Sequence, residues 1–201
     1  MGIMLQRSLR EPVAKIIKPI VGFLVRIGIT ANLISIIGGV GSSICALYFF
    51  SNGEFFIGVI TVTAFVLFDL FDGAVARASS VGESQWGAVL DSTLDRISDA
   101  AIFIGALLFY IPTADPMIPL ILIAATASYL VSYIRARAES LDIVCSGGIA
   151  ERSERLIIIL TAFGLHGLGV DFAVAIGMWI VAILSIFTVF QRVMIVYKAV
   201  K

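Results

Sequence analysis

Four aspartates at helical spacings are the residues of this sequence best suited to do chemistry. Asp69 and Asp72 are three residues apart, and Asp91 and Asp95 are four apart. In an α-helix each pair shares one face, because residues three or four apart are neighbours on the helix surface. Two such pairs brought together would form a pocket of oxygen ligands, which suits a hard divalent cation such as Mg²⁺ or Mn²⁺.

The segments that must position these acids are strongly apolar. Of the 201 residues, 60% are hydrophobic and only 14% are charged, and the mean hydropathy is +1.06. A soluble domain of this size does not need so much apolar surface, so we expect the lipid bilayer to surround most of the chain. The two cysteines, Cys45 and Cys145, predict no disulfide framework.

Six apolar runs are near the ~20 residues that a membrane-crossing helix needs, although the fifth is short and has room to start earlier. They cover residues 32–50, 55–76, 87–110, 117–134, 155–168 and 172–190. Before them, residues 9–27 mix prolines and basic residues with apolar ones, which predicts an amphipathic helix lying on the membrane. A soluble cap helix is the alternative for that segment. The predicted fold is all-α: a single polytopic membrane domain over residues 1–201, with the interfacial helix at 9–27 and a six-helix transmembrane bundle at 30–197.

Basic residues predict the orientation of the six spans. The connectors 51–54, 111–116 and 169–171 contain no Lys or Arg. All 14 basic residues fall in the N-terminal segment, in 77–96, in 135–155 or in the 192–201 tail. By the positive-inside rule these four regions are cytoplasmic, so both termini face the cytoplasm.

This topology places the four aspartates near the cytoplasmic ends of the second and third spans. A short turn between those spans makes them antiparallel neighbours, so the acids can face one another at one depth. Ionisable groups inside spans are costly and mark functional sites by default. Salt bridges with Arg77 and Arg96 are the structural alternative, but two arginines cannot neutralise four carboxylates.

The spacing of these acids resembles the signature of the CDP-alcohol phosphotransferases. The matching residues are Asp69, Asp72, Gly73, Ala76, Arg77, Gly87, Asp91 and Asp95. Enzymes of that family move a substituted phosphoryl group from a CDP-linked donor to an alcohol and release CMP. The resemblance implies that the four aspartates hold one or two Mg²⁺ or Mn²⁺ ions, and that Asp95 also acts as the base. Charge neutralisation by metal ions and proton removal by a nearby carboxylate are both suited to that reaction.

Several residues around the acids are predicted to bind the CDP-linked donor, which the resemblance implies is CDP-diacylglycerol. Gly73 lets a nucleotide approach the helix backbone, and Arg77 is placed to fork onto phosphates. By resemblance, Ser84 matches a position that contacts the cytidine nucleotide. The turn Thr30, Ala31, Asn32, Leu33 resembles the family's entry to its first helix, with Ala31 where Pro is usual. An ordinary helix cap is the alternative reading of that turn.

Polar residues at the ends of the later spans predict a site for the acceptor. Ser132 and Arg135 close the fourth span, Arg155 opens the fifth and Arg192 closes the sixth. Guanidinium groups around an acidic metal site suit a phosphorylated, water-soluble acceptor. Plain positive-inside anchoring is the alternative, and we favour it for the remaining basic residues of this side: Arg137, Arg152, Lys198 and Lys201.

Three segments closely resemble the prokaryotic phosphatidylinositol phosphate synthases within that family: SYIRARAE, GGIAERSER and QR. The resemblance implies 1-phospho-myo-inositol as the acceptor, phosphatidylinositol phosphate as the product, and a homodimer in the prokaryotic cytoplasmic membrane, with no nucleic-acid partner. Arg135, Ala150 and Ser153 stand where Lys, Ile and Pro are usual. These departures leave another acceptor open, such as glycerol 3-phosphate.

A divalent-cation transporter is the alternative class of function. Its acids should extend through the full depth of the membrane or recur in inverted repeats. Here the acids gather on the cytoplasmic half, and spans four to six carry no matching motif. Asp99, one turn beyond Asp95, is interpreted as a polar partner of Arg96 or Ser98 and not as a metal ligand.

Overall fold

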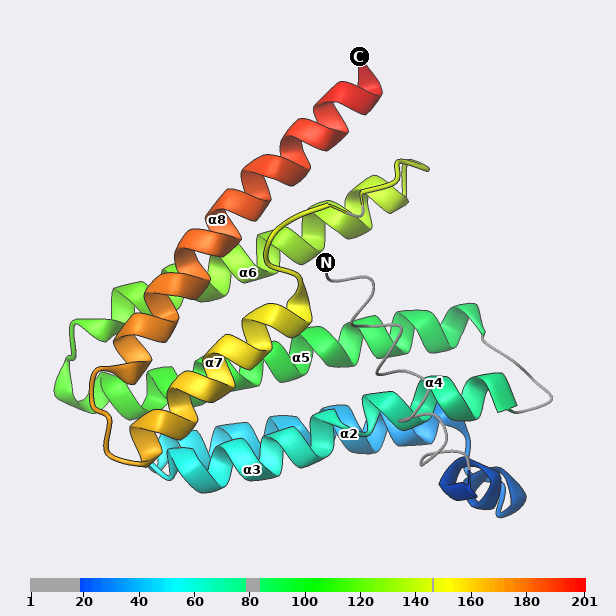
Figure 1. Cartoon of the computed structure of the whole chain (residues 1–201), viewed down its shortest axis with the longest axis horizontal. Helices are drawn as coiled ribbons and strands as arrows, with labels where there is room; N and C mark the ends of the chain where they lie inside the picture. The colour runs from blue at the N-terminus through cyan, green and yellow to red at the C-terminus, as the bar shows by residue number, and fades with distance from the viewer. Residues whose placement is uncertain (1–18, 79–83, 146) are drawn as a thin grey trace. The chain divides into compact units, whose positions relative to one another are not determined.

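The computed structural model describes residues 19–78, 84–145 and 147–201, with the backbone alone at Asp69, Leu70, Asp72, Arg77 and Ala78. All regular secondary structure in these residues is helical, which confirms the predicted all-α class for them (Figure 1). Residues 19–26 form a helix, and residues 9–18 of the predicted interfacial helix lie outside the described residues. The remaining elements are α2 (Ala31–Cys45), the π-helix η1 (Ala46–Phe50), α3 (Phe55–Val66), α4 (Asp69–Ala78), α5 (Gln85–Tyr110), the 3-10 helix η2 (Ile111–Thr113), α6 (Met117–Glu139), α7 (Arg152–Gly167) and α8 (Ala173–Val200).

Helices occupy all six of the predicted apolar runs. Three of these segments are long and apolar enough to cross a membrane: Ala31–Phe50, Met117–Glu139 and Ala173–Val200. The second run differs from the prediction, because a turn at Leu67 and Phe68 divides it into α3 and α4. Phe68 donates its N–H to Phe65 and Phe71 donates to Phe68, so bonds between residues three apart replace the regular α-helical ladder. Asp69 is therefore the first residue of a new helix.

The fifth span begins three residues earlier than predicted, at Arg152. A reciprocal capping box sets this start: Glu151 is the N-cap, and the Glu154 carboxylate accepts a hydrogen bond from the Glu151 N–H at 2.7 Å. Such a box satisfies two N–H groups that the first turn of a helix would otherwise leave unpaired.

The chain divides into two compact units. The first comprises the chain up to Ser42 together with Val62–Ser98, and the second comprises Ser43–Thr61 together with Asp99–Lys201. All four predicted metal-binding aspartates belong to the first unit, and all four predicted acceptor-binding residues belong to the second.

In the first unit, α2 is packed closely on two sides through its glycines. A Cβ on Gly38 would lie 3.0 Å from Cβ of Phe68, and a Cβ on Gly39 would lie 2.7 Å from Cβ of Leu94. These small residues therefore act within the chain, where they let helices approach closely.

In the second unit, α7 and α8 pack together and α8 also packs along α6. Phe50, Phe55 and Phe163 form an aromatic cluster with ring centroids 4.8 to 5.7 Å apart. Gly105 of α5 passes directly against the carbonyl oxygen of Ala46, where a Cβ would collide. This framework positions the first turn of α7, which carries the basic residues discussed below.

Candidate active site

The contacts of α2 with α4 show that these two helices run antiparallel. Gly38 lies against Phe68, just before α4 begins. Nearer the start of α2, Ile34 shares a buried core cluster with Val75, seven residues further along the chain than Phe68. The residue numbers rise in opposite directions, so α4 passes down α2 toward its N-terminus.

The contacts of α2 with α5 show that these two helices run parallel. Gly87, near the start of α5, lies against the side chain of Asn32, and Leu94 lies against Gly39. Both contacts have the same offset in residue number, so α5 runs parallel to α2. It follows that α4 and α5 are antiparallel to each other, as the sequence predicts.

These two registers bring the backbone of all four aspartates to one stretch of α2. Asp69 follows Phe68 and Asp95 follows Leu94, and those two contact adjacent glycines of α2. Asp72 lies between Phe68 and Val75, which contact α2 from the α4 segment. Asp91 lies between Gly87 and Leu94, which contact α2 from α5. At ~1.5 Å of rise per residue, the four positions fall within about two helical turns.

The described carboxylates of this stretch suit a divalent cation in their chemistry. Asp91 and Asp95 are both partly buried, and Asp95 lies 3.5 Å from Nη2 of Arg96. Oxygen donors from carboxylates are the ligands that Mg²⁺ and Mn²⁺ prefer. Among the side chains that the structure describes, no group of three or more His, Cys, Asp or Glu is gathered closely enough to hold a metal ion. The full predicted ligand set includes Asp69 and Asp72, whose backbone alone is described.

Five of the seven predicted donor-binding residues, Thr30 to Leu33 and Ser84, lie where the N-termini of α2 and α5 meet. Thr30 Oγ accepts a hydrogen bond from the Leu33 N–H at 3.3 Å, and Ser84 Oγ accepts one from the Gly87 N–H at 2.9 Å. Each hydroxyl thus caps its helix. A Cβ on Gly87 would lie 3.1 Å from both the Asn32 side-chain oxygen and Ser84 Oγ. Two helix N-termini side by side create a positive potential that suits phosphate groups.

Two of the predicted acceptor-binding arginines donate hydrogen bonds to carbonyl groups of the loop before α7. Arg192 of α8 is only 2% exposed and donates from Nε to Gly147 O at 2.9 Å and from Nη1 to Val131 O at 2.6 Å. Arg155 of α7 is 3% exposed and donates from Nη1 to Ala150 O at 2.7 Å. The loop is further fixed where the Ala150 N–H donates to Oγ of Thr188, one turn before Arg192.

The other two predicted acceptor-binding residues, Ser132 and Arg135, lie on α6 just after Val131. Ser132 is partly buried and adjoins Val131, whose carbonyl binds Arg192. Arg135 is exposed, one turn further along α6, and donates from Nε to Glu139 at 2.8 Å. The structure thus brings Arg155 and Arg192 to one loop, while Ser132 follows the residue whose carbonyl binds Arg192 and Arg135 lies one turn further along α6. A guanidinium has five N–H donors, so contacts to carbonyls are compatible with phosphate binding.

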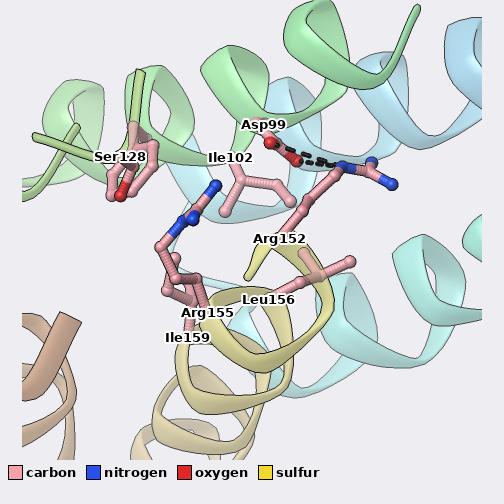
Figure 2. A pocket seen from close by; sticks show the side chains of 8 residues that line it. Asp99, Ile102, Ser128, Arg152, Arg155, Leu156 and Ile159 are labelled. Atoms are coloured by element: carbon pink, nitrogen blue, oxygen red, sulfur yellow. Dashed lines mark hydrogen bonds and ion pairs between the residues drawn. The ribbon is translucent and has the colours of Figure 1, made fainter. Parts of the chain in front are cut away.

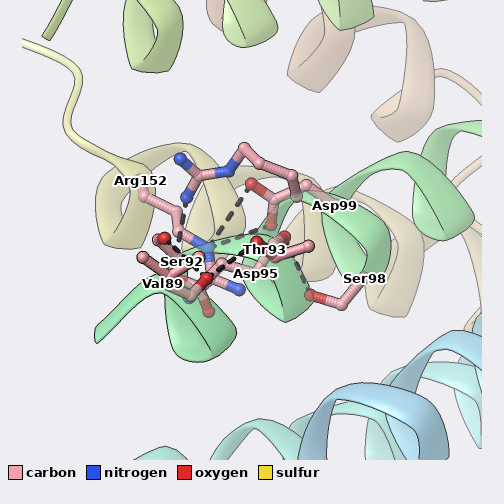
Figure 3. A network of polar contacts seen from close by, with 8 residues as sticks. Val89, Ser92, Thr93, Asp95, Ser98, Asp99 and Arg152 are labelled. Carbon is pink, nitrogen blue, oxygen red and sulfur yellow. Dashed lines mark hydrogen bonds and ion pairs between the residues drawn. The ribbon is translucent and has the colours of Figure 1, made fainter. Parts of the chain in front are cut away.

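An ion pair between Asp99 and Arg152 is the main feature that sequence reasoning misses. Arg152 Nε lies 3.1 Å from one Asp99 oxygen and 3.4 Å from the other, and each side chain is 21% exposed (Figure 3). The two residues are 53 positions apart, so no helical spacing connects them. Sequence analysis interprets Asp99 as a polar partner of Arg96 or Ser98, whereas the structure pairs it with Arg152. The signal that the sequence offers is the cost of placing a carboxylate one turn deeper than Asp95.

Asp99 and Arg152 line a pocket together with Ser128 and Arg155. The apolar part of its wall consists of Ile102, Phe103, Leu156 and Ile159. Figure 2 shows the Arg155 guanidinium pointing between Ser128 and Ile102, while Arg152 turns toward Asp99. The pocket therefore combines one carboxylate with two guanidinium groups.

Comparison with known proteins relates this geometry to a family. The family model described as CDP-alcohol phosphatidyltransferase matches residues 28–196. A phosphatidylinositol phosphate synthase of Mycobacterium tuberculosis is 41% identical over 200 residues, covering 94% of this chain and 89% of the relative. A phosphatidylinositol phosphate synthase of Streptomyces avermitilis is 39% identical over 205 residues, covering 97% of this chain and 83% of the relative.

Solved structures agree with the sequence relatives. A crystal structure of the Mycobacterium tuberculosis phosphatidylinositol phosphate synthase with CDP-DAG bound is similar to this chain with a TM-score of 0.86 and 42% identity, covering 92% of this chain and 94% of that one. The same enzyme in complex with manganese and citrate has a TM-score of 0.84 at 41% identity, covering 90% and 88%. Matches to transferases over nearly the whole chain decide between the two classes of function that the sequence leaves open. The chain belongs to the CDP-alcohol phosphatidyltransferase family, and it is an enzyme of that family and not a cation transporter.

Proposed function

We propose that this protein transfers the phosphatidyl group of CDP-diacylglycerol to 1-phospho-myo-inositol, which yields phosphatidylinositol phosphate and CMP. The observation that carries the proposal is its likeness, at 42% identity over 92% of the chain, to a phosphatidylinositol phosphate synthase solved with CDP-DAG bound. The placement of the four aspartates along one stretch of α2 supports it independently.

Asp69, Asp72, Asp91 and Asp95 would hold one or two divalent ions, Mg²⁺ or Mn²⁺, and a relative has been solved with manganese. When bound, such ions neutralise the charge of the pyrophosphate and orient it. Asp95 would accept the proton of the attacking hydroxyl. That hydroxyl oxygen then forms the new bond to the phosphorus of the phosphatidyl group, while the anhydride bond breaks and CMP leaves.

The donor site would lie at the paired N-termini of α2 and α5. Thr30, Ala31, Asn32 and Leu33 form the first turn there, and Ser84 caps the second helix beside them. Gly73 and Arg77 of α4 are the remaining proposed contacts, because α4 runs down α2 toward the same end. The N–H groups of the two helix ends and the cation of Arg77 would bind the donor's phosphates.

The acceptor site would consist of Ser132, Arg135, Arg155 and Arg192. Arg155 and Arg192 donate to carbonyls of the loop before α7, and their burial strengthens their attraction for a phosphate. This arrangement selects for a phosphate group on the acceptor. Inositol phosphate and glycerol 3-phosphate both carry such a phosphate group. Glycerol 3-phosphate is therefore the second candidate acceptor.

We propose a single membrane domain over residues 1–201 with six spans, both termini on the cytoplasmic side, and a homodimer as in the family. Six helical segments of the described chain support the spans. In the helix over residues 19–26, Val21 is buried against α2 and α4, while Ile20, Phe23 and the following Ile27 are 45–61% exposed. An exposed apolar side on that helix supports its placement at the membrane surface.

Incubation of the purified protein with CDP-diacylglycerol, Mg²⁺ and a panel of acceptors tests this function. We expect CMP release with 1-phospho-myo-inositol, its loss on chelation, and its recovery when Mg²⁺ or Mn²⁺ is restored. Release with glycerol 3-phosphate alone would contradict the acceptor but not the reaction. No release with any acceptor would contradict the reaction itself.

A further inference from the structure

The Asp99–Arg152 ion pair connects α5 to the first turn of α7 within the second unit. Its two N–O distances of 3.1 and 3.4 Å show the Arg152 Nε lying against both carboxylate oxygens (Figure 3). Both side chains are 21% exposed, so solvent screens this pair less than it screens a surface pair. The contact is therefore suited to fixing one helix against the other.

Arg152 is an unfavourable residue for its position in α7. It is the first residue after the Glu151 N-cap, where the helix dipole favours acidic side chains and opposes a cation. The capping box already satisfies the helix start through Glu151 and Glu154. Helix formation alone therefore gives no reason for an arginine there, whereas the contact with Asp99 does.

Arg155 lies three residues after Arg152, so the two arginines share a face of α7. Both line the pocket that contains Asp99 (Figure 2). A contact that fixes the rotation of α7 at Arg152 also fixes where the buried guanidinium of Arg155 points. The carboxylate of Asp99 further offsets the repulsion between the two cations.

We propose that Asp99 is a positioning residue for acceptor binding: through Arg152 it holds the first turn of α7 so that Arg155 can bind the acceptor's phosphate. This inference rests on the proposed function, because it takes Arg155 to be a phosphate ligand. Asp99 itself need not contact the substrate. Its role differs from that of Asp95, one turn earlier on α5, which is proposed to act on the reacting hydroxyl.

The steady-state kinetics of Asp99→Asn test this role, with the acceptor and the donor varied separately. We expect the KM for 1-phospho-myo-inositol to rise about tenfold, while the KM for CDP-diacylglycerol changes by less than about twofold. Simple electrostatics predicts the opposite sign, because removal of a negative charge would strengthen phosphate binding and lower the acceptor KM. A lowered or unchanged acceptor KM, or an equal rise of both constants, would overturn the proposal.

Arg152→Gln and the double variant show whether the two residues act as one unit. If Asp99 works through Arg152, the double variant should be no more impaired than the worse single variant, whereas independent effects would multiply. Arg152→Lys should recover part of the acceptor affinity that Arg152→Gln loses. Multiplying effects or absence of recovery would overturn the proposal.

Asp171→Asn serves as the matched control, because Asp171 is exposed in the turn before α8. Its kinetics should equal those of the parent protein. Thermal unfolding of each variant in detergent separates loss of folding from loss of affinity. If both Asp99→Asn and Arg152→Gln fail to fold, the pair is structural and the positioning role is wrong. If the parent protein itself releases no CMP, the proposed function fails instead.

Discussion

The carboxylate of Asp95 is partly buried on α5 and lies 3.5 Å from the Arg96 guanidinium. A carboxylate in this position can both bind a metal ion and take a proton, but an amide can take no proton. We therefore expect Asp95→Asn to lower turnover by at least about 100-fold, the scale of general-base catalysis, while donor affinity falls far less. CMP release measures turnover, and equilibrium binding of CDP-diacylglycerol measures affinity.

The same two measurements on Asp91→Asn provide the comparison for Asp95. Asp91 is proposed as a metal ligand without a role in proton transfer. Asp91→Asn should therefore weaken the affinity for the metal ion and the affinity for the donor together. A loss of donor affinity at Asp95→Asn that matches its loss of turnover would refute the role as base.

Arg155 is one of the two buried arginines of the proposed acceptor site. It is 3% exposed and is held by the carbonyl of Ala150. Charge-assisted hydrogen bonds contribute about 1.5–3 kcal/mol, so Arg155→Ala should raise the acceptor KM by roughly 10- to 100-fold. Arg137→Ala is the control, because Arg137 is exposed and bonds only locally to Ser140 in the described structure. Equal changes in the donor and acceptor constants of Arg155→Ala would contradict the assignment.

Residue spacing predicts much of this site, but only where one helix carries the pattern. The pairs Asp69/Asp72 and Asp91/Asp95 can be predicted because residues three or four apart share one face of a helix. The contact of Asp99 with Arg152 joins residues 53 positions apart, so it depends on how α5 packs against α7. The carbonyl contacts of Arg192 depend in the same way on the loop before α7.

At the scale of helices, apolar runs locate the elements but not their interruptions. The run over residues 55–76 contains no charged residue before Asp69, and hydropathy alone gives no sign of the turn at Leu67 and Phe68. That turn makes Asp69 the start of α4, beside Gly38 of α2. Side-chain packing between helices determines this geometry, and no repeating pattern in the sequence marks where that packing interrupts a helix.

Close packing of α5 at Gly105 yields a prediction for stability. A Cβ there would collide with the carbonyl oxygen of Ala46, so Gly105→Ala should destabilise the fold by about 1–3 kcal/mol through overpacking. Gly164→Ala is the control, because its Cβ would meet only Val59 at 3.8 Å. The control should be neutral or stabilising by up to about 1 kcal/mol, because alanine favours the helix. Thermal unfolding in detergent measures both, and equal unfolding temperatures would contradict the close approach.

For the whole molecule, the distribution of basic residues predicts which loops face the cytoplasm. The connectors at 51–54 and 111–116 lack Lys and Arg, whereas the tail after Arg192 contains Lys198 and Lys201. A membrane-impermeant thiol reagent applied to intact cells tests this orientation. The background variant replaces Cys45 and Cys145 with alanine, since these are the two cysteines of the chain.

Single cysteines then report each side of the membrane. Glu54→Cys should be labelled in intact cells, because Glu54 is exposed in a connector predicted to face outward. Lys201→Cys should be labelled only after lysis, because the proposed six spans would place the C-terminus on the cytoplasmic side with the N-terminus. Labelling of Lys201→Cys in intact cells would mean an odd number of crossings or an inverted chain. The paired N-termini of α2 and α5 would then no longer be required to face the cytoplasm, where CMP and the phosphorylated acceptor are expected.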